Sequence, residues 1–93
     1  MPALSEYSNV HATAFRVIAD KGFRVWYDAH HDAYFAERDG WDLRADSPCG
    51  LLGLVAIFEH VGPSEFREYW WRLERDFELP RQAPDYRPVW QRD

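Results

Sequence analysis

Apolar side chains recur at helical spacing near the start of the chain, where they would share one face of a helix. That face is made of Tyr7, Val10, Ala14, Val17, Ile18 and Lys21. Ser5, Ser8 or Asn9 can cap the first turn, and Gly22 stands where helices commonly end in a left-handed turn. The pattern predicts a helix from about Ser8 to Lys21.

Three short segments follow in which aromatic and β-branched residues are interleaved with polar ones, a pattern typical of strands. They are Phe23–Asp28, Ala33–Glu37 and Trp41–Ala45. The residues between them, 28–32 and 38–40, are rich in turn formers. The spacing therefore predicts a three-stranded antiparallel meander.

The turn after the second strand allows two registers, which place the side chains of that strand on opposite faces. A two-residue Asp39-Gly40 turn sets Glu37 opposite Asp42, whereas a three-residue loop with a glycine bulge pairs Phe35 with Leu43. Like charges directly opposite each other are unfavourable, and apolar pairs are favourable. We therefore expect the three-residue loop.

This register assigns the side chains of the sheet to two faces. The expected core face carries Phe23, Val25, Tyr27, Ala33, Phe35, Leu43 and Ala45. The expected outer face carries Arg24, Trp26, Tyr34, Ala36, Arg38, Asp42 and Arg44.

A second helix is predicted from Ser47-Pro48, because serine caps helices and proline suits the first helical position. It should end near Val61, before Gly62-Pro63. Its positions are apolar almost all round, which predicts a buried central helix. The residues expected to be most buried are Leu51, Leu54, Val55 and Phe58.

Small residues at Gly50, Gly53 and Ala56 form a strip along this helix, where another backbone can approach closely. We expect the strip to pack against the protein's own sheet, with a dimer seam as the alternative.

A third, amphipathic helix is predicted over about Ser64 to Glu78. Its apolar arc contains Phe66, Tyr69, Trp70, Leu73 and Phe77. Trp71 falls on the opposite, charged side, between Arg67 and Arg75. It therefore cannot share the core with Trp70.

Together these elements predict an α+β fold in which helices pack on a three-stranded antiparallel β-meander, in the order α-β-β-β-α-α. Residues 1–79 should form a single domain. Residues 80–93 hold Pro80, Pro84 and Pro88 and should form an extended Pro-rich tail that packs on the domain or on a partner.

Charge and composition exclude several classes of function. The chain has 93 residues, with 11 Lys and Arg against 16 Asp and Glu and a net charge of −5, which disfavours binding to nucleic acid or an anionic membrane. The longest apolar run, Leu51–Phe58, is far short of the about 20 residues of a membrane span. A lone cysteine, Cys49, fits a reducing cytoplasm, so we expect a soluble cytoplasmic protein.

The first five predicted elements have the order found in double-stranded RNA-binding domains. The basic cluster that opens the last helix of those domains is replaced here by Pro48-Cys49-Gly50-Leu51. The resemblance is therefore limited to element order and implies no function.

Few residues suggest catalysis or metal binding. Asp28, His30, His31 and Asp32 crowd one hairpin loop, but they form no complete ligand set, so we expect a solvent-exposed, metal-free loop. Cys49 lies where a helix N-terminus favours a thiolate, yet the sequence places no histidine beside it, which favours a structural role. His60 should stabilise the end of the same helix. We expect no cofactor.

Two aromatic surfaces rise above this background, because Trp, Tyr and Arg are enriched at binding hot spots. The first is the outer sheet face with Trp26, Tyr34, Arg24 and Arg44, and the second is Trp71 with Arg67 and Arg75. Both could instead be covered within the monomer.

The sequence therefore predicts a small acidic interaction module that binds a second copy or another protein, as inhibitor and immunity proteins do. The alternatives are a small metal-dependent or thiol enzyme using His30 and His31 or Cys49, and an aromatic-lined pocket for a small ligand.

Overall fold

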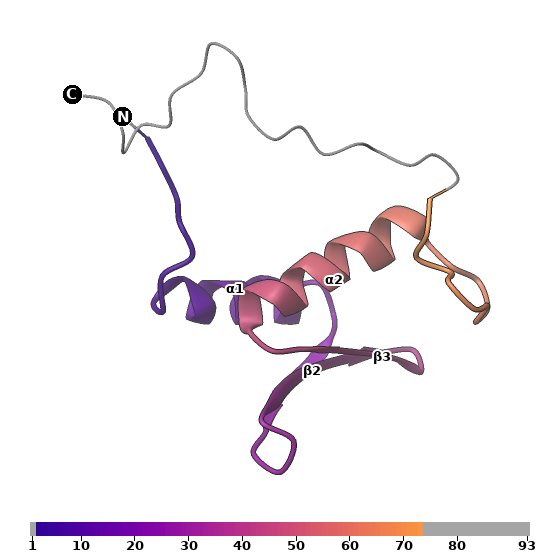
Figure 1. Cartoon of the computed structure of the whole chain (residues 1–93), viewed down its shortest axis with the longest axis horizontal. Helices are drawn as coiled ribbons and strands as arrows, with labels where there is room; N and C mark the ends of the chain where they lie inside the picture. Colours follow the sequence, from indigo (N-terminus) through magenta and orange to yellow (C-terminus); the bar gives the residue numbers. More distant parts are fainter. Residues whose placement is uncertain (1, 74–93) are drawn as a thin grey trace.

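The structure is a computed structural model that describes residues 2–73. Its elements are helix α1 (Val10–Asp20), strands β1 (Arg24–Asp28), β2 (Ala33–Arg38) and β3 (Trp41–Ala45), and helix α2 (Pro48–Val61). The strands form one antiparallel sheet in the order β1-β2-β3, and both helices pack on the same face of it (Figure 1). The predicted α+β meander is confirmed. Within the described residues, no helix is long and apolar enough to cross a membrane.

The ends of α2 are set by capping residues that can be identified in the sequence. The Gly50 amide donates a 2.9 Å hydrogen bond to the Ser47 hydroxyl, and Pro48 occupies the first helical position. Gly62 closes the helix with a φ of 59°, in the left-handed region that glycine adopts without strain. The predicted bounds of α2 are therefore confirmed.

The turn between β2 and β3 contradicts the expected register. Asp39 and Gly40 both have positive φ, 54° and 85°, and Glu37 pairs with Asp42. The connection is therefore a two-residue turn, and the expected three-residue loop is wrong. Asp-Gly suits such a turn because both central residues must adopt positive φ.

The charge that argued against this register is compensated locally. The Glu37 carboxylate accepts hydrogen bonds from the Gly40 amide at 3.1 Å and from Arg24 Nε at 3.0 Å. The Gly40 amide first, and then Arg24, lower the pKa of Glu37. Because these two donors compensate the charge of Glu37, its carboxylate can lie opposite Asp42.

The two-residue turn reverses the expected faces of β2. Val25 pairs with Ala36, and Trp26 pairs with Phe35. Consequently Tyr34, Ala36 and Arg38 face the helices, whereas Phe35 faces outward. The expected faces of β1 and β3 hold.

Three elements enclose the buried core: α1, α2 and the inner face of the sheet. Its buried members are Ile18, Phe23, Ala36, Leu43, Leu51, Val55 and Phe58. Leu51 and Val55 are fully buried, as expected, but Leu54 is only half-buried. The expected full burial is therefore wrong for Leu54, which packs against the core cluster but stays partly exposed.

The small-residue strip of α2 approaches the sheet at one end only. A methyl group at Gly50 would lie 3.6 Å from the Ala45 side chain of β3, whereas one at Gly53 would meet no atom within 4 Å. The helix contacts α1 and the sheet through the side that carries Leu51, Val55 and Phe58. The expected packing of the strip against the sheet therefore holds at Gly50 and fails at Gly53.

Residues 64–73 form bends and turns rather than the first two thirds of the predicted third helix. Tyr69 has a φ of 56°, which interrupts helical geometry. Phe66 is 76% exposed, whereas Trp70 is half-buried, its ring 5.3 Å from that of Trp41. The remainder of that helix and the tail lie outside the described residues.

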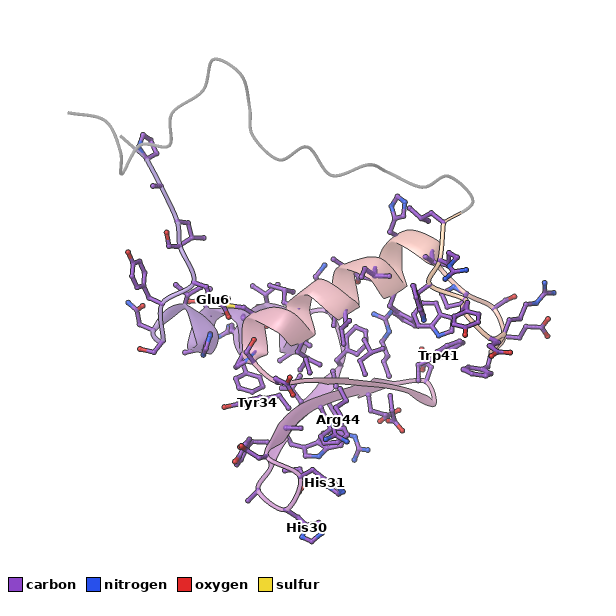
Figure 2. The ribbon with its side chains drawn as sticks, in the orientation of Figure 1. Glu6, His30, His31, Tyr34, Trp41 and Arg44 are labelled. Carbon is purple, nitrogen blue, oxygen red and sulfur yellow. The ribbon has the colours of Figure 1, made fainter. Side chains whose placement is uncertain are left out.

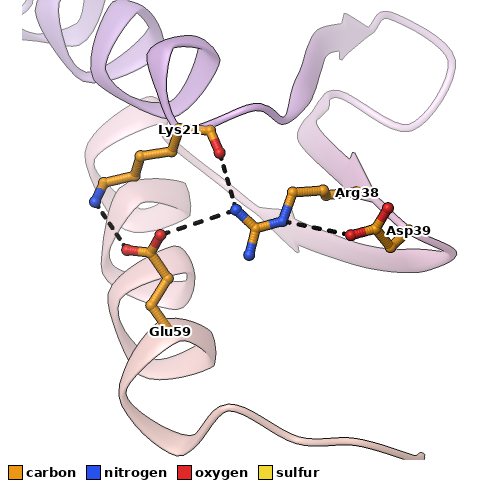
Figure 3. Close-up of polar contacts among 4 residues, drawn as sticks. All are labelled: Lys21, Arg38, Asp39 and Glu59. Atoms are coloured by element: carbon orange, nitrogen blue, oxygen red, sulfur yellow. Dashed lines mark hydrogen bonds and ion pairs between the residues drawn. The ribbon is translucent and has the colours of Figure 1, made fainter.

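Arg38 joins the sheet to both helices (Figure 3). Its guanidinium lies 4.3 Å from the centre of the Phe23 ring and donates a 2.9 Å hydrogen bond to the Lys21 carbonyl just after α1. It also lies 4.0 Å from Glu59 of α2, which accepts a 2.8 Å hydrogen bond from Lys21 Nζ. A second carboxylate, that of Asp39, lies 4.0 Å from Arg38. The charge of Arg38 on the inner face thus has a carbonyl, an aromatic ring and two carboxylates as neighbours.

The difference between two leucines of α2 tests this core. Leu51→Ala should reduce the free energy of unfolding by about 2–5 kcal/mol, because it leaves a cavity in the core. Leu54→Ala should cost less than about 2 kcal/mol, because that side chain is already partly in water. Urea unfolding of both variants measures the difference, and equal losses would contradict the described orientation of α2.

Two glycines with open surroundings should respond in opposite directions to alanine. No atom lies within 4 Å of a methyl group at either position, so only the backbone matters. Gly40→Ala should destabilise by about 1–2 kcal/mol, because its φ of 85° is left-handed. Gly53→Ala should stabilise by about 0.5–1 kcal/mol, because alanine favours a helix. Thermal unfolding checks both signs; a destabilising Gly53→Ala would mean that something covers the strip.

Candidate functional site

The outer face of the sheet carries a stacked aromatic pair. Trp26 of β1 and Phe35 of β2 are cross-strand partners. Their ring centres lie 5.5 Å apart and their planes differ by 7°. Trp26 is 37% exposed and Phe35 is half-buried. The pair therefore presents a flat apolar surface directly to solvent.

Two arginines frame this pair from the same face. The Arg24 guanidinium carbon lies 5.5 Å from the centre of the Trp26 ring, and that of Arg44 lies 5.8 Å from the centre of the Phe35 ring. Arg24 is also held by its ion pair with Glu37. These four aromatic and arginine side chains, Trp26, Phe35, Arg24 and Arg44, are called the outer aromatic surface below.

Tyr34 does not belong to this surface, although we expected it there. It faces the helices, with its ring centre 5.4 Å from that of Phe15 and 5.0 Å from that of Tyr27. The physical reason is the two-residue turn, which exchanges Tyr34 and Phe35 between the faces. The Asp39-Gly40 dipeptide was the signal that could have identified Phe35.

Neither helix covers the outer aromatic surface. In Figure 2, Arg44 and His31 project away from the helices, on the opposite side of the sheet. The His31 ring lies edge-on to Phe35, with 6.4 Å between their centres. Within residues 2–73, all helical structure packs on the other face.

Charges of opposite sign lie beside this surface on β3. Asp42 and Arg44 are both exposed and lie on the outer face, two positions apart. Neither forms an ion pair with another residue in the part of the chain that the structure describes.

The second expected surface, at Trp71, differs from its prediction. Trp71 is 49% exposed, and Arg72 rather than Arg67 lies over its ring, at 5.9 Å. Arg67 donates a 3.0 Å hydrogen bond to Glu65 instead. Arg75 lies outside the described residues. The expected flanking by Arg67 fails because residues 64–73 do not form a helix.

Trp71 helps to line an open pocket of 320 Å³ beside β3. The walls are formed by Asp42, Leu43, Arg44, Leu54, Ile57, Trp70 and Trp71. The half-buried position of Leu54 is thus explained, because its side chain forms part of this wall. The pocket adjoins Arg44, so the two aromatic surfaces meet at β3.

In the loop between β1 and β2, which contains His30 and His31, several polar groups bond to one another. The Asp28 carboxylate accepts hydrogen bonds from the backbone amides of His30 and His31 and lies 2.8 Å from His31 Nδ1. The side-chain bond with His31 is the main cause that lowers the Asp28 pKa. Tyr27 donates a 2.6 Å hydrogen bond to Asp32, which raises the Tyr27 pKa. Both histidines are exposed, as expected.

A different group of potential ligands does converge. The ligand atoms of Glu6, His11 and Cys49 all lie within 4.8 Å of one another, and within residues 2–73 they form the single group of this kind. Sequence reasoning missed His11 as a neighbour of Cys49. No local pattern could have revealed it, because the contact depends on how α1 packs against α2.

No family model, no curated protein and no solved structure matches this chain, so its function is argued from these surfaces alone.

Proposed function

We propose that this protein is a small interaction module that binds a second copy of itself through the outer aromatic surface. The observation that carries the proposal is the stacked Trp26–Phe35 pair, framed by arginines on a sheet face that no described helix covers. A solvated sheet face normally carries polar side chains at such positions. An apolar pair there is explained by a partner that removes it from water.

The composition and rigidity of the surface favour binding. Trp and Arg are the residue types most enriched at hot spots, where a few anchors supply most of the binding energy. Trp26 is held by its stacking on Phe35, and Arg24 by its ion pair with Glu37. Little side-chain freedom is therefore lost on association, which lowers the entropic cost of binding.

The charges on β3 favour a second copy over an unlike partner. In a two-fold dimer, residue i of one copy contacts residue j of the other, and j contacts i. Asp42 and Arg44 are of opposite sign, lie on one face and have no ion-pair partner among residues 2–73. A two-fold axis near Leu43 would pair each Asp42 with the Arg44 of the other copy.

Removal of one ring from the outer aromatic surface should weaken self-association. Trp26→Ala and Phe35→Ala should each raise the dimer dissociation constant at least about tenfold, since anchors of this type contribute more than about 1 kcal/mol. Sedimentation equilibrium measures the constant, and circular dichroism confirms that the fold is kept. Tyr7→Ala is the matched control, because Tyr7 is 66% exposed and lies before α1. A monomeric wild type would contradict the proposal.

Reversal of the β3 charges tests the two-fold arrangement itself. Asp42→Arg and Arg44→Asp should each weaken the dimer by placing like charges together. The double variant Asp42→Arg/Arg44→Asp should restore much of the affinity, because the exchanged charges again meet across the axis. A double variant as weak as the sum of the single variants would exclude this pairing and favour an unlike protein partner on the same face.

A further inference from the structure

Three segments that are far apart in the sequence bring metal-binding side chains to one place. Glu6 lies in the segment before α1, His11 in the first turn of α1, and Cys49 in the first turn of α2. In Figure 2, a sulfur atom lies beside the labelled Glu6. This cluster is on the helical side of the molecule and is independent of the outer aromatic surface.

The separations of the three ligand atoms suit a tetrahedral ion. Glu6 Oε2 lies 3.2 Å from His11 Nε2, and all three ligand atoms lie within 4.8 Å of one another. Zinc bonds of about 2.0–2.3 Å at tetrahedral angles separate the ligand atoms by about 3.3–3.7 Å. Small side-chain rotations would therefore close the group around one ion.

Cys49 follows Pro48 in the first turn of α2 and is half-buried. The dipole of that helix opposes a bare cation at its N-terminus. A metal binds cysteine as the thiolate, which together with the Glu6 carboxylate would supply two negative charges to the ion. The side chains of His11 and Glu6 are 31% and 56% exposed, so an ion can enter from solvent.

The geometry favours a metal over a thiol–histidine–carboxylate catalytic relay. In such a relay the nucleophile and the carboxylate bind opposite nitrogens of the imidazole, which separates them by more than about 6 Å. Here the ligand atoms of Cys49 and Glu6 lie within 4.8 Å of each other. The three groups thus converge on a single point.

We propose that Glu6, His11 and Cys49 bind one Zn²⁺ ion. Thiolate, imidazole and carboxylate are the three ligand types that zinc takes in proteins. With three protein ligands, the fourth position is open to water or to a donor from another molecule. The ion would also tie the segment before α1 to the first turns of both helices.

Cobalt is the first probe, because Co²⁺ adopts the same tetrahedral sites and gives a thiolate-to-cobalt charge-transfer band in the near ultraviolet. The purified full chain is stripped with a chelator and titrated with Co²⁺ and then with Zn²⁺. We expect the band to saturate at one equivalent and to disappear when zinc displaces the cobalt. Absence of the band would overturn the proposal.

Variants assign the ligands. Cys49→Ala should abolish the band, and His11→Asn or Glu6→Gln should lower zinc affinity at least about tenfold, because loss of even an outer-shell partner has an effect of 10–100-fold. His31→Asn is the matched control and should leave affinity unchanged, although it removes another exposed histidine. Loss of affinity in His31→Asn with retention in His11→Asn would move the site to the hairpin loop and overturn the proposal.

A third measurement requires no variant. Zinc should slow the reaction of Cys49 with a thiol reagent at least about tenfold. The ratio of the rates without and with zinc should fall as the pH is lowered, because protons compete with the metal for thiolate and imidazole. Cys49 is the single cysteine of the chain, so the signal is unambiguous. An unchanged rate at saturating zinc would exclude Cys49 as a ligand. Sedimentation of Glu6→Gln distinguishes failure of zinc binding from failure of dimerisation, because this variant should still form the dimer.

Discussion

The two-residue turn at Asp39-Gly40 is the constraint on which the rest of the sheet depends. Side chains alternate along a strand, so a shift of one residue in this turn would exchange the two faces of β2. The observed turn sends Phe35 outward to stack on Trp26 and brings Arg38 inward to the helices. The outer aromatic surface and the junction between sheet and helices thus have one common cause.

An arginine on the inner face is tolerated because its charge has several partners. Arg38 stacks on Phe23, donates to the carbonyl of Lys21 and lies near Glu59. An unpaired charge against a core would be strongly unfavourable. Lys21 directly follows α1 and Glu59 lies in α2, so the contacts that satisfy the charge also link both helices to the sheet (Figure 3).

Local signals in the sequence predicted the helices and strands between residues 10 and 61, but neither the turns of residues 64–73 nor the contacts between elements. The bounds of α2 follow from Ser47, Pro48 and Gly62, whose roles depend only on their neighbours. The register of β2 was mispredicted because Glu37 and Asp42 are like charges, and their facing side chains do not reveal that the Gly40 amide compensates Glu37. Residues 64–73 have helical periodicity yet form turns, since periodicity does not reveal a left-handed residue such as Tyr69.

Among residues 2–73, helices cover only one face of the sheet, and this asymmetry makes the residue types on the outer face informative. An antiparallel sheet with one solvated face is stable when its outward residues are polar, as Arg24, Glu37 and Arg44 are here. Trp26 and Phe35 interrupt that pattern at adjacent cross-strand positions. Their stacking and the arginines over them reduce their contact with water only in part, since Trp26 remains 37% exposed. Residues 2–73 leave this apolar area partly exposed, and the proposed association would bury it.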